Sequence, residues 1–111
     1  MNDAMTKAYI EAIYFTETGD IGQPEHDEPL SPDTMREAWG ACHRLRLACS
    51  EHDGIDLSQY DQTQIGHDLW LTRNGHGAGF WDKPEIYGAD NARILTFMAR
   101  AMGEHNAEFG E

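Results

Sequence analysis

The chain is poor in basic residues: it has 8 Lys and Arg against 20 Asp and Glu, a formal net charge of -12 over 111 residues. Nucleic-acid affinity depends on cationic contacts to phosphates, so this deficit argues against direct binding of DNA or RNA. The same negative field attracts proteins that are themselves basic, and many of these are nucleic-acid-binding machines. In a generic acidic protein, however, the excess acid serves solubility alone.

Long apolar runs are absent, and cysteine is rare. No stretch of 18 apolar residues occurs, so the sequence predicts no membrane span, and the N-terminus has no signal-peptide pattern. Cys42 and Cys49 are the only cysteines, and in one helix they would lie about 10 Å apart, too far for an unstrained disulfide. We therefore expect buried thiols in a reducing compartment, and we place the protein in the cytoplasm.

The apolar content is sufficient for one core. Apolar residues make up 40% of the chain, including three Trp, four Tyr and four Phe. Such a composition needs neither a disulfide nor a structural metal, and we expect no cofactor. The length fits one domain over residues 1–111.

Three segments have helical periodicity, at about 2–16, 31–50 and 88–102. The second begins with Ser31, Pro32 and Asp33, a strong helix start, and the third ends at Gly103. Within the second, one apolar face is predicted, and Arg36, His43, Arg44 and Arg46 fall mainly away from it. The apolar face comprises Met35, Ala38, Trp39, Cys42, Leu45 and Cys49.

The stretch from Ile65 to Asp82 contains Asn74-Gly75, the dipeptide of a two-residue hairpin turn. In that register one face of the hairpin is apolar, and the other carries Trp70 and Trp81. We therefore predict an α+β domain in which about three helices pack on one face of a two- or three-stranded antiparallel sheet. The sheet has a central β-hairpin at about 67–82, and residues 105–109 are a weak candidate for a third strand.

The outer face of this hairpin is the predicted contact surface. Trp70, Arg73 and Trp81 are the types of residue that dominate binding energy at interfaces. The acids that would meet a basic partner lie in the connections 17–33 and 51–61, namely Glu25, Asp27, Glu28, Asp53 and Asp56. The same outer face, with its two exposed tryptophans, could instead close a homodimer.

A small metal-dependent enzyme is a weaker alternative. It would use His67, Asp68 and His76, but no metal-ligand spacing such as His-x-x-x-His or Cys-x-x-Cys is present. Both cysteines fall on the apolar helix face, which argues against nucleophilic catalysis. The sequence therefore favours a protein that is not an enzyme.

The segment 67–82, HDLWLTRNGHGAGFWD, resembles a motif of a family of small uncharacterised proteins carried by tailed phages, prophages and plasmids. Tyr9 to Ala12 and the pair Ser31 and Pro32 are similar to that family too, whereas Lys83-Pro84-Glu85 departs from its glycine-rich turn. The resemblance implies a phage or mobile-element origin and action in the cytoplasm of a bacterial host. It brings no catalytic residue.

Charge and resemblance together predict an inhibitor that acts by protein-protein interaction. The expected partner is a basic, nucleic-acid-binding host defence complex, and an anti-CRISPR or anti-restriction protein that mimics DNA would fit. A structural or housekeeping phage adaptor is the alternative, and nothing in the residues separates the two.

Overall fold

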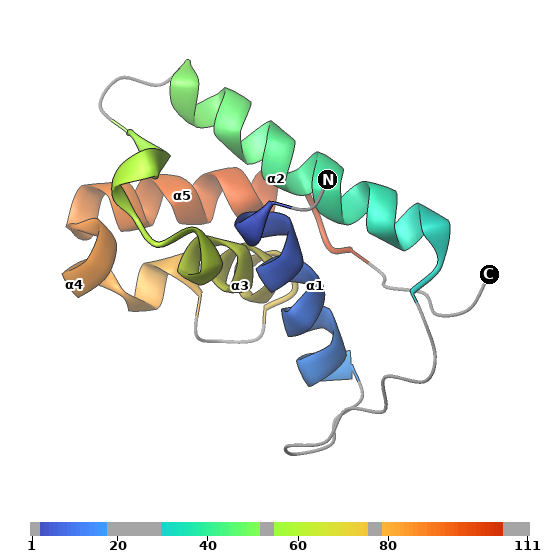
Figure 1. Cartoon of the computed structure of the whole chain (residues 1–111). Helices are drawn as coiled ribbons and strands as arrows, with labels where there is room; N and C mark the ends of the chain where they lie inside the picture. The colour runs from blue at the N-terminus through green and yellow to red at the C-terminus, as the bar shows by residue number, and fades with distance from the viewer. Residues whose placement is uncertain (1–2, 18–29, 52–54, 76–78, 106–111) are drawn as a thin grey trace.

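Figure 1 presents a computed structural model of the chain, which describes residues 3–17, 30–51, 55–75 and 79–105. Within these ranges the chain forms five α-helices and two short 3₁₀ helices. In chain order they are α1 (Ala4–Glu17), α2 (Pro32–Ser50), η1 (Leu57–Gln59), α3 (Gln62–Arg73), η2 (Phe80–Asp82), α4 (Pro84–Tyr87) and α5 (Ala89–Ala101).

The predicted sheet is wrong, because the first half of the expected hairpin is helical. Apart from a single bridged residue, Leu30, the part of the chain that the structure describes contains no β-structure. α3 begins where the Asp61 carboxylate accepts a hydrogen bond from the amide of Thr63, at 2.9 Å. It ends at Asn74-Gly75, where Gly75 has φ +67°. The dipeptide that predicted a hairpin turn is the C-terminal end of a helix, another position that favours a left-handed glycine.

The expected third strand has no support in the described residues. His105 lies in irregular structure, and residues 106–109 fall outside the described ranges. The fold is therefore a helical domain in place of the predicted α+β arrangement.

The three predicted helices are confirmed, with small differences at their ends. Ser31 caps α2, since its hydroxyl accepts a hydrogen bond from the amide of Thr34 at 3.1 Å, and Pro32 occupies the first turn. α5 ends two residues before Gly103, whose φ is +80°. Cys42 and Cys49 are free and buried, as expected.

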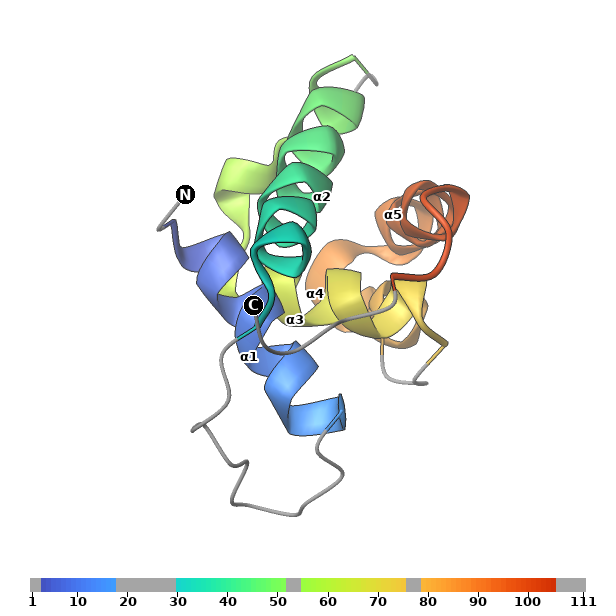
Figure 2. The ribbon, with the colours of Figure 1, turned by 90° about the vertical axis from the view of Figure 1, so that its right-hand side faces the viewer.

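α3 lies at the centre of the domain. It packs most extensively against α1 and also contacts α5, so that α1 and α5 lie on opposite sides of it (Figure 2). α2 lies across α1 and α5 (Figure 1). No helix in the described ranges is both long and apolar enough to span a membrane.

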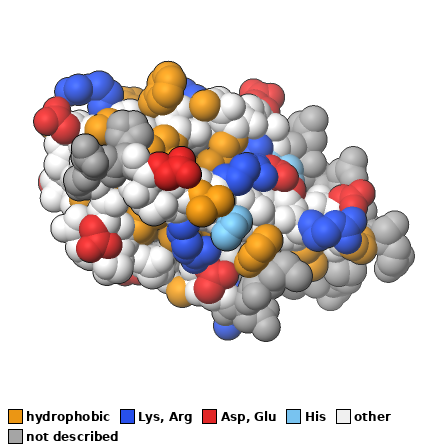
Figure 3. Space-filling model, turned by 90° about the horizontal axis from the view of Figure 1, so that it is seen from above, with side chains coloured by type: hydrophobic (Ala, Val, Ile, Leu, Met, Phe, Trp, Pro, Cys, Tyr) orange, Lys and Arg blue, Asp and Glu red, His pale blue; other side chains and the backbone are white. Residues whose placement is uncertain are grey.

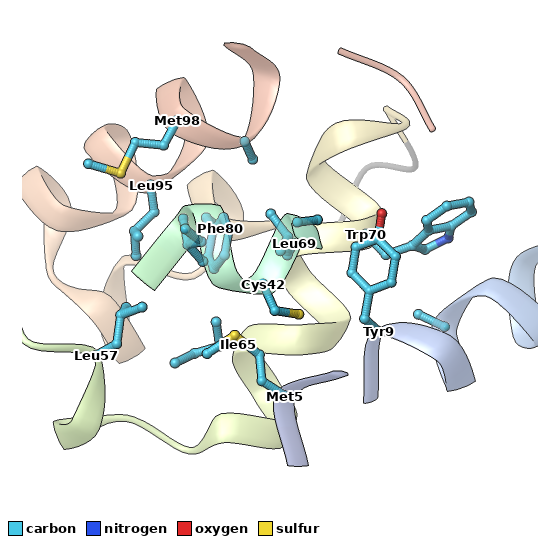
Figure 4. Packing of buried hydrophobic residues seen from close by; sticks show 14 of the residues in the cluster. Met5, Tyr9, Cys42, Leu57, Ile65, Leu69, Trp70, Phe80, Leu95 and Met98 are labelled. Atoms are coloured by element: carbon cyan, nitrogen blue, oxygen red, sulfur yellow. The ribbon is translucent and has the colours of Figure 1, made fainter. Parts of the chain in front are cut away.

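The core is formed where these helices meet around α3. Figure 4 shows Ile65, Leu69 and Trp70 of α3 among side chains from α1, α2 and α5. The approach of α1 is unusually close, because a Cβ atom on Gly66 would lie only 2.1 Å from the carbonyl oxygen of Met5. Only a glycine at position 66 permits this packing of α1 against α3.

Candidate interaction surface

Residues 79–82 lie against α3 and are held there by a close approach of the backbone. Gly79 lies so close to Thr72 that an added Cβ would be 2.0 Å from the threonine hydroxyl oxygen. The next amide, of Phe80, donates a hydrogen bond to the same hydroxyl at 3.0 Å, and the Phe80 ring is fully buried. Trp81 therefore follows an anchored residue, and its own side chain is 50% exposed.

A buried carboxylate holds the following turn. Asp68 on α3 has no solvent exposure, and its oxygens accept hydrogen bonds from Nζ of Lys83 at 2.9 Å and from the hydroxyl of Tyr87 at 2.6 Å. Gln64 also donates to it. Burial, followed by the hydrogen bond to Asp68, raises the pKa of Tyr87 well above its usual range. α4 is thereby tied at both ends to the central helix.

The outward side of this anchored segment combines apolar and acidic groups. Ile86 of α4 is 40% exposed, and Trp81 of the neighbouring η2 is 50% exposed. Three exposed carboxylates accompany them in the same stretch of chain, at Asp82, Glu85 and Asp90. We call these five residues the 81–90 surface.

The negative charge of the 81–90 surface is only partly neutralised by the basic residues near it in the sequence. Lys83 is turned inward to Asp68, and its side chain is 20% exposed. Arg93 contacts Asp90 at 3.4 Å, but both side chains are largely solvated, and such pairs contribute little to stability. Asp61 adds negative potential nearby, because it is among the charges that raise the pKa of Tyr87. The surface is thus net acidic with an aromatic side chain at its start.

Of the predicted contact residues that lie within the described ranges, only Trp81 and Asp56 are exposed. Trp70 has no exposed surface: its indole N–H donates to the Thr16 hydroxyl at 2.8 Å, and its ring packs edge-on against Tyr9. The expectation that Trp70 anchors a partner is therefore wrong. In a helix, Trp70 falls on the side that faces α1, whereas the hairpin register had turned it outward.

Arg73 is also a structural residue and not an exposed anchor. It is 6% exposed, and its guanidinium donates to the carbonyl oxygens of Gly103 at 2.8 Å and Met102 at 3.3 Å. It also donates to the Tyr9 hydroxyl at 3.1 Å and to Glu37 at 2.9 Å. Arg73 therefore joins α1, α2 and the end of α5 to α3.

The predicted acidic residues are only partly described. Glu25, Asp27, Glu28 and Asp53 lie outside the described ranges. Asp56 is exposed and caps η1, accepting hydrogen bonds from the amide and hydroxyl of Ser58 at 3.0 and 2.6 Å. These bonds lower its pKa.

The alternative metal site gains no support from the geometry. The Asp68 oxygens are already bound by Lys83, Tyr87 and Gln64, while Nε2 of His67 lies 3.4 Å from Glu11. His76 lies outside the described residues. Among the residues that are described, no group of three potential His, Cys, Asp or Glu ligands comes together.

The structure reveals a second exposed apolar surface, on α2. Met35, Trp39 and Leu47 are 46%, 36% and 49% exposed, and the rings of Trp39 and His43 stack with their centroids 5.0 Å apart. Sequence analysis had placed Met35 and Trp39 on the buried face, so this assignment was wrong. Figure 3, which views the molecule from the side of α2, shows hydrophobic side chains interspersed with basic, acidic and histidine side chains.

The i, i+4 spacing of these four residues was visible in the sequence. Met35 and Trp39 belong to a different row of the helix surface from Ala38 and Leu45, which face the core. This difference in row was the sequence signal for their exposure. We call Met35, Trp39, His43 and Leu47 the α2 stripe.

Comparison of the chain with protein-family models, with curated proteins and with solved structures found no match.

Proposed function

We propose that this protein acts by binding a basic protein through the 81–90 surface. The observation that carries the proposal is the half-exposed Trp81, which shares with the exposed Ile86 and three exposed acids a segment that Asp68 fixes to the core. Aromatic side chains in such positions supply much of the binding energy at interfaces. The fixed backbone reduces the entropy that is lost on binding.

The negative charge of the protein indicates that its partner is basic. The 81–90 surface carries three exposed carboxylates, and the whole chain carries a net charge of -12. A basic protein would be steered towards this surface, and the association rate would fall as salt screens the field. Proteins that bind nucleic acid present such basic surfaces, which makes a nucleic-acid-binding complex the proposed partner.

The finer form of the proposal is an inhibitor of a host defence complex, such as an anti-CRISPR or anti-restriction protein. It rests on the acidic charge and on the resemblance of residues 67–82 to phage and mobile-element proteins. In this form the acids occupy the phosphate-binding surface of the partner and exclude its nucleic acid. Action in the bacterial cytoplasm belongs to the same proposal.

The test is capture from bacterial lysate with the tagged protein at low and at moderate salt. The wild type should retain a basic, nucleic-acid-binding protein, identified by mass spectrometry, and Trp81→Ser should lose it. Phe97→Ser is the matched control, because Phe97 is 74% exposed but lies outside the 81–90 surface. Trp70 is unsuitable as a probe, since truncation of a fully buried Trp costs about 3–5 kcal/mol of stability.

A second pair of variants separates local charge from total charge. The triple change Asp82→Asn, Glu85→Gln and Asp90→Asn should weaken capture at least tenfold. The triple change Glu11→Gln, Glu51→Gln and Glu104→Gln removes the same number of exposed charges elsewhere and should leave capture nearly unchanged. Equal losses in both triples would refute a specific 81–90 surface. Capture of a phage-encoded protein in place of a host complex would favour the adaptor role.

A further inference from the structure

The α2 stripe runs along exposed positions of α2, from the edge of its buried face at Met35 towards its outward side at Leu47. Its members recur every four residues, at Met35, Trp39, His43 and Leu47. The buried residues of the same helix are Thr34, Ala38, Ala41, Cys42, Leu45 and Cys49. Ridges of four-residue spacing pack into the grooves between the same ridges of a second helix.

The charges along α2 are divided between its two halves. Residues 32–41 contain two acids, Asp33 and Glu37, against one arginine, Arg36. Residues 42–50 contain Arg44 and Arg46 and no acid. The first half is therefore net negative and the second half net positive. An antiparallel copy of the same helix would bring the acidic half of one copy beside the basic half of the other, where Arg44 is already paired with Glu37 and Arg46 with Asp3 of its own chain.

The α2 stripe also lies on a helix that carries little of the chain's negative charge, so contact there causes little electrostatic repulsion between two copies. α2 has three arginines against two acids in a protein whose net charge is -12. Those acids are already paired, Asp33 with Arg36 and Glu37 with Arg44 and Arg73. Contact through α2 keeps the acidic 81–90 surface out of the interface.

We propose that the protein forms a homodimer in which the α2 stripes of two copies pack antiparallel. Met35 of one copy faces Leu47 of the other, and Trp39 faces the partner's His43 near the twofold axis. Such an interface is isologous, because the same patch serves both subunits. Two copies that each carry -12 repel at long range, so the dimer tightens as salt is added, the reverse of the salt dependence proposed for the basic partner.

Sedimentation velocity over a wide concentration range tests the association. The 12.5 kDa chain should approach twice its mass as concentration rises, and the dimer fraction should increase between low and moderate salt. A monomer at every concentration and salt level would overturn the proposal. It would leave the α2 stripe to a different protein.

Two substitutions test the surface. Leu47→Ser should raise the dimer dissociation constant at least tenfold, and Trp39→Ser should do the same, with folding checked by circular dichroism. Because both side chains are partly solvated, neither change should unfold the chain. Phe97→Ser is again the matched control and should leave the dissociation constant unchanged. A dimer that survives both α2 substitutions, or that Phe97→Ser weakens equally, contradicts this interface.

Cross-linking tests the orientation. A chain with Met35→Cys mixed with a chain with Leu47→Cys should form a disulfide-linked heterodimer, because these positions face each other only in the antiparallel arrangement. Met35→Cys alone should cross-link poorly, and efficient self-linking through position 35 would refute the proposed orientation. The native thiols do not interfere, because Cys42 and Cys49 are buried. The 81–90 variants should dimerise normally, which separates failure of this proposal from failure of the proposed function.

Discussion

The hydroxyl oxygen of Tyr9 lies 2.8 Å from Nδ1 of His105, although 96 positions of sequence separate the two residues. Arg73 donates a hydrogen bond to the same hydroxyl at 3.1 Å, and we assign the Tyr9 proton to the bond with His105. With this assignment Nδ1 of His105 is the acceptor, and the ring is neutral, in agreement with its lowered pKa. The ring also stacks on Tyr9 and meets the edge of Trp70.

The neutral state of His105 predicts a pH-dependent stability. Burial, followed by the positive charge of Arg73, lowers the pKa of His105 below its ordinary value of 6.5. Protonation therefore favours the unfolded chain. The contribution of His105 to stability is complete above about pH 6.5, the pKa in the unfolded chain, and is lost as the pH falls through the lowered pKa of the folded state.

Urea unfolding at pH 7.5 and pH 5.5 measures this effect. His105→Gln should abolish the part of the pH dependence that arises from this ring, because glutamine provides an acceptor that does not titrate. His67→Gln is the control, since its ring is 38% exposed. The comparison between variants is necessary because protonation of other groups also changes the self-repulsion of an acidic chain. If both variants keep the pH dependence of the wild type, the role assigned to His105 is wrong.

Asp68→Asn should be strongly destabilising. The substitution leaves the ammonium of Lys83 without its buried counter-charge and weakens the acceptor for the Tyr87 hydroxyl, so we expect a loss of about 3–5 kcal/mol in the free energy of unfolding. Asp90→Asn should change stability by less than about 1 kcal/mol, because the Asp90 side chain is 86% exposed. Chemical denaturation measures both. A loss below about 1 kcal/mol for Asp68→Asn would contradict its role in holding α4.

Two helical glycines should respond to alanine with opposite signs. Gly66→Ala would place a Cβ 2.1 Å from the Met5 carbonyl oxygen, so α1 and α3 must separate and the melting temperature should fall. Gly40→Ala meets only the end of the flexible Arg44 side chain, at 3.2 Å. There the better helix propensity of alanine should stabilise by about 0.5–1 kcal/mol. Stabilisation by Gly66→Ala would show that the α1–α3 packing is looser than described.

The two cysteines should be unreactive in the folded protein. Burial raises the pKa of Cys42 to about 11 and that of Cys49 to about 11, so little thiolate exists at neutral pH. Alkylation by iodoacetamide at pH 7.5 should be slow for the native chain and become fast in denaturant. Mass spectrometry of both states gives the result. Rapid labelling of the native chain would mean that α2 opens readily.

The failure of the predicted hairpin has a local cause. Asn74-Gly75 favours a left-handed glycine, and a hairpin turn and a helix end both use that conformation. Leu69 faces the core both in the predicted hairpin and in the observed helix. Its apolar character therefore did not distinguish a strand from a helix. Asp61 at the helix start was the signal that favoured a helix, since its carboxylate caps the first turn of α3.

Part of the candidate site was predictable, and part was not. Trp81 was selected from the sequence and is exposed, whereas Trp70 and Arg73 were selected by the same reasoning and are buried. Ile86 was missed because a helix of four residues is too short to show an apolar periodicity. Exposure of a side chain depends on which distant elements cover it, and local pattern carries little of that information.

The sequence by itself determined the net charge, the helix start at Ser31, the helix end before Gly103 and the burial of both cysteines, because these follow from composition, local capping and helical period. Only the tertiary structure decided which aromatic and charged side chains face solvent. Tyr9, Arg73 and His105 come from distant parts of the chain, and their hydrogen bonds form only when α1, α3 and the residues after α5 are packed together. Burial and hydrogen bonding are properties of neighbours in space, and the packing of helices on α3 supplies those neighbours.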